Sequence, residues 1–257
     1  MADPEHSRWR PGACEVIPIP EETAMPEALA ATWVVIPAYN EATMIQPVVA
    51  TLRQLGWRVV VVDDGSPDAT SDAARAGGAV VVRHPINLGQ GAALRTGFAY
   101  TIAQPGTRFI VTFDADGQHD PDAVSTLVAP LAQGQADVVL GSRFLDSAAV
   151  AEVPPLRRLL LRTATWVSRT TTGLPLTDAH NGLRAFTTAA VERLQLQQDR
   201  MSHASEIQAE IARRGLRCVE RSVRVRYTSY SLAKGQHLVD AINILWDLLL
   251  TPRRSRS

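Results

Sequence analysis

The chain has 257 residues, of which 46% are hydrophobic and 20% charged, and this excludes a disordered, collagen-like or disulfide-rich protein. The length suits one large α/β domain with short appendages. Basic and acidic residues number 26 each, so the formal charge is zero and a strongly charged partner such as a nucleic acid is not expected. The charge is unevenly distributed, because residues 1–140 carry 8 basic and 16 acidic side chains and residues 141–257 carry 18 and 10.

The two ends of the chain contain no recognisable targeting segment. Residues 1–31 hold scattered acids and prolines without an apolar run of signal-peptide length, which predicts a flexible leader. The longest apolar stretch, residues 241–250, is interrupted by Asn243 and Asp247 and is too short to span a bilayer. The two cysteines, Cys14 and Cys218, suggest no disulfide framework and favour the reducing cytoplasm.

Short apolar runs alternate with helical patterns through the first half of the chain. The apolar runs predict strands at residues 33–36, 59–62, 79–82, 109–113 and 138–140. Runs without polar interruption are typical of strands buried on both faces of a sheet. Helices are expected between them, at residues 41–55, 68–76 and 90–103 and after Pro121. This alternation predicts an α/β fold with a largely parallel sheet, built from right-handed crossovers and flanked by helices.

The second half begins with an Arg-bearing amphipathic helix at residues 156–172. A short strand at 183–186 and a helix at 202–214, ended by Gly215, follow it. Residues 217–227 alternate valine with charged side chains such as Glu220 and Arg224, which predicts a strand with one face in solvent. A final helix from about residue 236 to 250 precedes a basic tail.

Two carboxylates one residue apart, Asp114 and Asp116, follow the predicted 109–113 strand. Ligands in open α/β sheets bind beyond the carboxyl ends of the strands, and paired acids there repel each other unless a cation lies between them. Oxygen ligands favour Mg²⁺ or Mn²⁺, and Gln118 could add a neutral oxygen. The alternative is a turn with helix-capping carboxylates, in which His119 is a structural histidine and Asp120 caps the helix after Pro121.

Asp63 and Asp64 also follow an all-valine strand. They suit either a simple turn or charge-assisted hydrogen bonds to a ribose or base. The glycine-rich loop at residues 87–91 allows a close backbone approach but is a weak signal. Neither Gly-x-Gly-x-x-Gly after the first strand nor a Walker-type lysine loop is present, which disfavours a dehydrogenase or a P-loop NTPase.

Five motifs, taken together, resemble those of the family 2 glycosyltransferases, which have the GT-A fold. The resemblance covers roughly residues 32–235 and favours the branch of dolichol-phosphate mannose synthase and the bacterial polyprenyl-phosphate glycosyltransferases. The motifs are Val35-Ile36-Pro37-Ala38-Tyr39-Asn40-Glu41, Val62-Asp63-Asp64-Gly65-Ser66, Asn87-Leu88-Gly89 with Gly97, Asp114-Ala115-Asp116-Gly117-Gln118-His119 and Gly141-Ser142-Arg143-Phe144. A sixth segment, Asp178 to Phe186, matches the branch pattern Asp-x-x-Ser-Gly-Phe-Arg-Ala-Tyr with Asn181 in place of Ser.

The resemblance implies a role for each matching residue. The nucleotide-sugar would be bound by Pro37, Tyr39, Asn40, Glu41, Asp63, Asp64, Gly89, Asp114 and Ala115, and the metal by Asp114, Asp116 and Gln118. The acceptor would be bound by Asp178, Asn181, Arg184 and Glu206, and the catalytic set would be Asp116, Arg143, Arg226 and Lys234. The branch usually ends its core with Arg-x-x-Gly-x-Ser-Lys, whereas here Ser229 stands in place of the Gly and Lys234, the only lysine, comes later.

The implied reaction transfers a sugar from a nucleotide diphosphate with inversion, helped by Mg²⁺ or Mn²⁺. A hydroxyl acceptor needs a general base, whereas a lipid phosphate is already an anion and needs cations to position it. The second half lacks the Glu-Asp pair and the Gln-x-x-Arg-Trp segment, so it does not resemble the processive polysaccharide synthases of the family. A phosphate acceptor is favoured by its basic side chains, since arginine is suited to bidentate phosphate recognition, although each of them could also belong to a solvated surface. These side chains are Arg157, Arg158, Arg162, Arg169, Arg184, Arg224, Arg226 and Lys234.

The two amphipathic helices suggest a peripheral membrane protein. On a helical wheel, Leu159, Trp166 and their apolar neighbours lie opposite the arginines of the 156–172 helix, and the last helix precedes a basic tail. Basic helices with Trp can lie in a membrane interface, but these apolar faces could also pack on the domain. We therefore predict a cytoplasmic location at the inner face of the membrane.

The predicted chain organisation is a leader at residues 1–31, a GT-A domain at 32–235 and an amphipathic helix with a basic tail at 236–257. Two other functions stay open: transfer to the hydroxyl of a glycan or soluble acceptor with Asp178 or Glu206 as base, and nucleotide-sugar binding without turnover. The intact Asp114 and Asp116 pair argues against the second. A nucleotidyltransferase is disfavoured because the first strand is followed by residues 37–41 and not by a Gly-rich basic loop.

Overall fold

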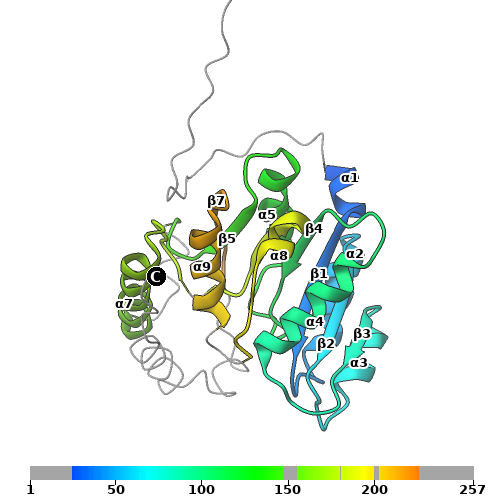
Figure 1. The fold of residues 1–257 in the computed structure, drawn as a ribbon. Coiled ribbons are helices and arrows are strands. Elements are labelled where there is room, and N and C mark those ends of the chain that lie inside the picture. The colour runs from blue at the N-terminus through cyan, green and yellow to red at the C-terminus, as the bar shows by residue number, and fades with distance from the viewer. Residues whose placement is uncertain (1–24, 147–154, 180, 200–202, 226–257) are drawn as a thin grey trace, which may run out of the picture.

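The computed structural model of the protein describes residues 25–146, 155–179, 181–199 and 203–225. Within these residues a single seven-stranded sheet runs in the order β3-β2-β1-β4-β6-β5-β7 (Figure 1). The strands are β1 (Thr32–Ala38), β2 (Arg58–Asp63), β3 (Val80–Arg83), β4 (Phe109–Thr112), β5 (Val138–Ser142), β6 (Arg184–Thr187) and β7 (Cys218–Ser222). Only the pairs that β6 makes, with β4 and β5, are antiparallel. The sheet is therefore mixed and mostly parallel, as the sequence predicts.

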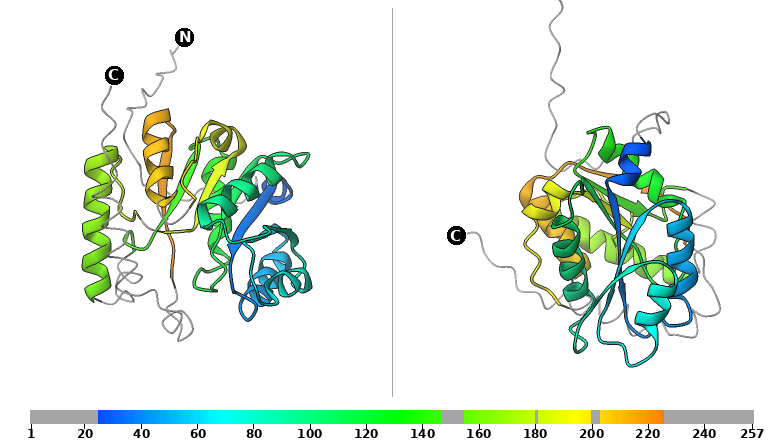
Figure 2. Two further views of the ribbon diagram at one scale, coloured as in Figure 1. Left: turned by 60° about the horizontal axis from the view of Figure 1, so that its bottom comes forward. Right: turned by 90° about the vertical axis from the view of Figure 1, so that its right-hand side faces the viewer.

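Helices cover both faces of the sheet and form three layers (Figures 1 and 2). One face packs against α1 (Met25–Ala30), α2 (Ile45–Gln54), α3 (Thr70–Ala76) and α5 (Ala123–Ala132). The other face packs against α4 (Gln90–Ile102), α8 (Thr188–Arg193) and α9 (His203–Arg214). The remaining helix, α7 (Pro155–Thr172), packs against α9 at one end of the molecule (Figure 2). Among the described residues no helix is both long and apolar enough to cross a membrane.

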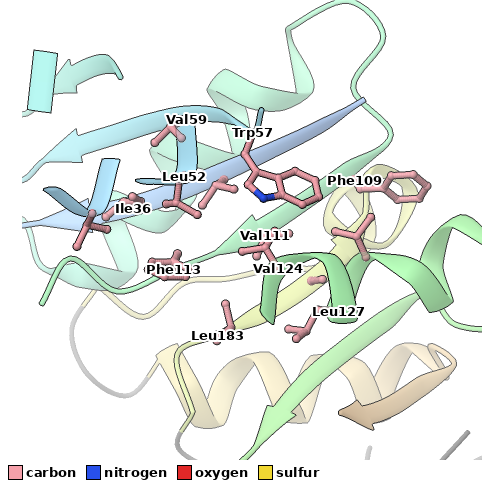
Figure 3. Packing of buried hydrophobic residues seen from close by; sticks show 14 of the residues in the cluster. Ile36, Leu52, Trp57, Val59, Phe109, Val111, Phe113, Val124, Leu127 and Leu183 are labelled. Atoms are coloured by element: carbon pink, nitrogen blue, oxygen red, sulfur yellow. The ribbon is translucent and has the colours of Figure 1, made fainter. Parts of the chain in front are cut away.

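The hydrophobic core follows from strand alternation in a sheet covered on both sides. Val59 and Val61 point to the cluster under α2 and α5, and Val60 points to the cluster under α4. Figure 3 shows the first cluster, in which Trp57, Phe109 and Leu127 pack together. Because both faces are buried, the central strands need apolar residues at every position, and this explains the valine run.

Three expectations from the sequence need correction. The expected leader ends before residue 31, because residues 25–30 form α1 and Ala28 is buried in the core. The strand at 217–227 has no fully solvated face, because Glu220 and Arg221 are both buried. The helix α7 packs through its small residues Ala164, Thr165 and Ser168, so Leu159 and Trp166 are exposed on the same side as Arg162 and Arg169 and not opposite the arginines. Helix α8 was not expected, and the predicted C-terminal helix and basic tail at 236–257 lie outside the described residues.

Candidate functional site

One edge of the sheet gathers most of the residues singled out in the sequence. The carboxyl ends of β1, β2, β4 and β5 meet there because these strands run in the same direction. Strand β6 runs the other way, so its first residue, Arg184, lies beside Thr112 at the end of β4 and Leu140 in β5. The segment before β6 therefore reaches the same edge as Asp114, although it comes about 65 residues later in the chain.

Asp114 is contacted by His119, five residues later in the chain, and by Gly182 from the segment before β6. Its Oδ2 lies 2.9 Å from Nε2 of His119, whose ring makes an edge-to-face contact with Phe113. The hydroxyl of Thr112 donates to the carbonyl oxygen of Gly182 at 2.7 Å, which brings this glycine against the Asp114 carboxylate. Any Cβ atom at position 182 would overlap that carboxylate, so the close approach requires glycine. The Asp114 side chain remains 31% exposed and is accessible to a ligand.

The pKa values of Asp114 and Asp116 shift in opposite directions. Burial raises the pKa of Asp114 most strongly, but the hydrogen bond from His119 and the electrostatic interactions with His119, Arg184 and His203 lower it below its usual value. Burial and then the charge of Asp114 raise the pKa of Asp116 to about 6. One carboxylate is therefore stabilised as an anion by its surroundings, and its neighbour is not.

The pair of carboxylates fits a divalent cation. Oδ1 of Asp116 accepts the backbone N–H of Gln118 at 3.0 Å, and within the described residues Oδ2 of Asp116 and Oδ1 of Asp114 accept no hydrogen bond. Gln118 is buried, and its Nε2 also has no partner among the described residues. Two carboxylates that repel each other and offer oxygen ligands suit a hard cation such as Mg²⁺ or Mn²⁺. In the described part of the chain, no three or more His, Cys, Asp or Glu side chains come together in a way that could hold a metal ion. Oxygen atoms of phosphate or water would therefore complete the coordination of an ion bound by this pair.

Asp63 and Asp64, which the resemblance assigns to the nucleotide, are both buried and hydrogen-bonded inside the protein. Asp63 accepts the backbone N–H of Ser66 at 2.9 Å and the hydroxyl of Ser71. Asp64 contacts Nδ1 of His84 at 2.7 Å and accepts two N–H groups of the 88–89 backbone, at 2.9 and 2.7 Å. These two aspartates shape the loops at this edge. His84, whose Nε2 lies 2.9 Å from Oγ1 of Thr96, was not singled out in the sequence.

The segment after β1 lies beside these loops. Asn40 has a positive φ of 56°, and its backbone N–H donates to the hydroxyl of Ser66 at 3.0 Å. The backbone N–H of Glu41 donates to Oγ1 of Thr70 at 2.9 Å. Tyr39 is 43% exposed and leaves an aromatic surface beside this edge of the sheet. Two further predicted residues are less open: Pro37 is partly buried, opposite Val62 in the sheet, and Ala115 is buried.

Arg143, which the resemblance assigns to the catalytic set, and Asp178, which it assigns to the acceptor, bind each other. Nε and Nη2 of Arg143 donate to the two carboxylate oxygens of Asp178 at 2.7 and 2.9 Å, and the Arg143 backbone N–H donates to Oδ2 at 3.2 Å. Both side chains are buried. A bidentate geometry with a third hydrogen bond is the arrangement in which a buried ion pair is stable.

Glu220 completes this group and was missed by the sequence analysis. From β7, its carboxylate accepts the backbone N–H and the hydroxyl of Thr177 and the backbone N–H of Asp178, at 2.8–3.2 Å. Burial raises the pKa of Glu220, and the hydrogen bonds from Thr177 and Asp178 oppose that shift. We call Arg143, Thr177, Asp178 and Glu220 the arginine clamp.

Asn181 and Arg184 lie between the arginine clamp and Asp114. Nε of Arg184 donates to the carbonyl oxygen of Asn181 at 2.9 Å, and Oδ1 of Asn181 accepts the backbone N–H of Leu183. Burial lowers the pKa of Arg184 to about 10, although the charges of Asp114 and Asp178 oppose the shift. Arg184 therefore supplies a buried positive charge that acts on both carboxylates.

Glu206, which the resemblance assigns to the acceptor, is hydrogen-bonded to backbone within the protein. Its carboxylate accepts the backbone N–H groups of Gln197 and Gln198 at 2.8 and 3.0 Å. The same segment continues to Asp199, whose carbonyl oxygen accepts the N–H of Gly91 in α4 at 2.8 Å. Glu206 thus fixes the segment that covers the start of α4, directly after the Gly89 loop. Two other predicted residues, Arg226 and Lys234, lie outside the described residues.

Comparisons with known proteins agree with this fold and show the family of the chain. The model of a family described as glycosyl transferase family 2 matches residues 33–195. An uncharacterized protein of Methanocaldococcus jannaschii is 35% identical over 221 residues, which are 85% of this chain and 90% of that protein. The UDP-N-acetylglucosamine–dolichyl-phosphate N-acetylglucosaminyltransferase of Methanococcus voltae is 30% identical over 240 residues, 85% of this chain and 94% of that protein.

Solved structures share the fold at lower identity. A crystal structure of glucosyl-3-phosphoglycerate synthase from Mycobacterium tuberculosis, in complex with Mn²⁺, UDP and phosphoglyceric acid, superposes with a TM-score of 0.65. The identity is 21%, and the match covers 95% of this chain and 87% of that one. At this identity the likeness establishes the fold alone, and it agrees with the predicted GT-A architecture.

Proposed function

The chain belongs to glycosyl transferase family 2, and on that premise we propose that it transfers a sugar from a nucleotide diphosphate to a polyprenyl phosphate with inversion and with Mg²⁺ or Mn²⁺. The M. voltae relative supports a lipid-phosphate acceptor, because its name gives dolichyl phosphate as the acceptor. The observation that carries the proposal is the sheet edge on which Asp114 lies between the neighbouring carboxylate of Asp116 and the buried cation of Arg184.

Asp114 and Asp116, which we call the acidic pair, would bind the metal ion and the nucleotide-sugar donor. When bound, the metal ion would act as a Lewis acid on the leaving diphosphate. Asp116, which forms no ion pair within the described residues, would bind it with its carboxylate, and His119 would hold Asp114 in place through the 2.9 Å hydrogen bond. Gly182 leaves room for this arrangement, because any side chain there would displace Asp114.

The absence of a free base among the residues suggested for that role favours a phosphate acceptor. Asp178 is bound bidentately to Arg143, and Glu206 accepts two backbone N–H groups. A hydroxyl acceptor would need one of these carboxylates to give up its partners and accept a proton. A lipid phosphate needs only cations, and Arg184 is a buried guanidinium beside Asp114.

A panel of nucleotide sugars with undecaprenyl phosphate tests the acceptor. We expect radiolabelled sugar from one donor to enter an organic-extractable, mild-acid-labile product. Asp116→Ala should abolish this transfer at any Mg²⁺ or Mn²⁺ concentration, whereas Asp122→Ala, which removes a nearby exposed carboxylate, should not. Label that appears only in water-soluble glycan would reject the polyprenyl acceptor, and full activity of Asp116→Ala would reject the metal site.

The exposed side of α7 supports a peripheral position at the membrane. Leu159 and Trp166 are 63% and 65% exposed. Arg162 and Arg169 are exposed too and each follows one of them by three residues, so they share this side of α7 and do not lie opposite the apolar residues as the helical wheel predicted. The 18 residues of α7 contain no acid. A surface of leucine, tryptophan and arginine without acidic groups suits the interface of an anionic bilayer.

Liposome sedimentation tests this surface on its own. Leu159→Ser should weaken binding to vesicles that contain anionic lipid, because it removes an apolar side chain from the side of α7 that faces the bilayer. Leu55→Ser, at an exposed leucine after α2, is the matched control and should leave binding unchanged. Equal binding by both variants and the wild-type protein would reject the assignment of α7 as the membrane surface.

A further inference from the structure

Glu220 uses both carboxylate oxygens to hold one short segment of backbone. Oε1 accepts the N–H groups of Thr177 and Asp178 at 2.9 and 3.2 Å, and Oε2 accepts the N–H and the hydroxyl of Thr177 at 2.9 and 2.8 Å. Glu220 is only 3% exposed. A carboxylate is buried at this depth only where donors replace its lost water, and here these donors come from a segment 42 and 43 residues away in the chain.

The charge of Glu220 fixes the direction of a chain of hydrogen bonds. Because an ionised carboxylate only accepts, the Thr177 hydroxyl donates to it. Oγ1 of Thr177 then accepts from the Ser142 hydroxyl at 2.6 Å, and Oγ of Ser142 accepts the backbone N–H of Phe144 at 3.1 Å. Glu220 therefore orders the turn on both sides of Arg143 as well as the segment that carries Asp178.

The guanidinium of Arg143 depends on this order. It is buried, and both carboxylate oxygens of Asp178 accept hydrogen bonds from it. If the 177–178 backbone moved, Asp178 would move with it, and the buried cation would lose its orientation. A displacement of about 1 Å in a group at a reaction centre costs roughly a hundredfold in rate.

We propose that Glu220 is a positioning residue for sugar transfer: it anchors the 177–178 backbone so that Asp178 holds Arg143 in one orientation at the reactive edge. This inference rests on the proposed function for its kinetic consequence. Its structural part, the control of Arg143 by Glu220, stands independently of the substrate.

The sheet offers a matched control for Glu220→Gln. Asp137 joins the same two strands, β5 and β7, at their opposite end, where it accepts the backbone N–H and the guanidinium of Arg217 at 2.8–3.2 Å. In Glu220→Gln the amide nitrogen faces backbone N–H donors and cannot accept from them. In Asp137→Asn the same chemical change lies away from the site.

The experiment compares the two variants in steady-state transfer and in thermal melting. We expect both to fold, Glu220→Gln to lower kcat about 10- to 100-fold with little change in the KM of the donor, and Asp137→Asn to leave kcat unchanged. Glu220→Gln combined with Asp178→Asn should lose little more than Asp178→Asn alone, because the two residues act through one unit. If Glu220→Gln retained full kcat, or lost activity only in proportion to the fraction of unfolded protein, the proposal would be overturned.

A spectroscopic readout separates this inference from the proposed function. In protein labelled with ¹⁵N-arginine, the Nε–H signal of Arg143, identified by its loss in Arg143→Lys, should shift and exchange faster with water in Glu220→Gln but not in Asp137→Asn. An unchanged signal would reject the positioning role even if no acceptor were found. If Glu220→Gln did not fold, Thr177→Val would replace it, because it removes the hydroxyl link to Ser142 and keeps the backbone bonds to Glu220.

Discussion

The acidic pair, which is partly exposed, and the arginine clamp, which is buried, are two groups of carboxylates at one edge of one sheet, and their electrostatic states are opposite. In the clamp, Asp178 meets a guanidinium bidentately, and Glu220 accepts from three donor groups. In the acidic pair, Asp116 has one backbone hydrogen bond and a neighbouring negative charge, and its pKa rises to about 6. The satisfied group needs nothing more, whereas the unsatisfied group gains most from a cation.

This difference assigns different work to similar residues. A carboxylate whose oxygens are all occupied holds other parts of the protein in place, as Asp63, Asp64 and Glu220 do. A carboxylate that is left without a counter-charge stores unfavourable energy that a bound ion releases. Both kinds follow strand ends in the sequence, so only their partners distinguish a binding residue from a supporting one.

The largest effect is expected from breaking the clamp at its ion pair. Asp178→Ala leaves the Arg143 guanidinium buried without its carboxylate, which should lower the free energy of unfolding by about 3–5 kcal/mol. Asp137→Ala breaks the partly exposed pair with Arg217, and this should cost about 1 kcal/mol or less. Urea unfolding of both variants measures the contrast. Equal losses in the free energy of unfolding would mean that the ion pair in the clamp contributes no more to stability than a partly exposed pair.

The acidic pair should respond in the opposite direction. Since the pKa of Asp116 rises from 3.8 to about 6 on folding, the native state binds this proton more tightly than the unfolded state. The stability of the metal-free protein therefore falls as pH rises between about 4 and 6. Asp116→Asn removes that loss and should raise the free energy of unfolding by up to about 3 kcal/mol above pH 7.

Melting curves with a chelator at pH 4.5 and pH 8 check this sign. The advantage of Asp116→Asn should be small at the lower pH and largest at the higher one. Added Mn²⁺ with UDP should raise the Tm of the wild-type protein and have little effect on the variant, because only the wild-type site binds the ion. A variant that is less stable than wild type at pH 8 would show that Asp116 already has a counter-charge.

The sequence predicts the sheet and the acidic pair well, because both depend on neighbours along the chain. The valine run of β2 needs only burial on both faces to be interpreted, and Asp114 and Asp116 lie two residues apart after a clear strand. The C-terminal end of α9 is marked in the same local way by Gly215, which has a φ of 59°.

The clamp could not be predicted because its partners are distant in the chain. The alternation around Glu220 indicates a solvated face, and only the folded protein brings Thr177 against it across 43 residues. Helix α8 was missed for a different reason: it has six residues, of which only Ala190 and Val191 are buried, so it shows no helical period. A local signal was present there, since the Thr187 hydroxyl accepts the N–H of Ala190 as a helix cap.

The smallest effect is expected where the Asp64 group is weakened at its far end. Thr96→Val keeps the size of the side chain but removes the partner of Nε2 of His84, while Nδ1 keeps its contact with Asp64. The loss of one buried hydrogen bond should lower the free energy of unfolding by about 1 kcal/mol. Because Asp64 is already satisfied by His84 and the 88–89 backbone, the Tm shift on adding Mn²⁺ with UDP should stay as in wild type. A reduced shift would mean that Asp64 acts with the acidic pair and that the division between supporting and binding carboxylates fails at this loop.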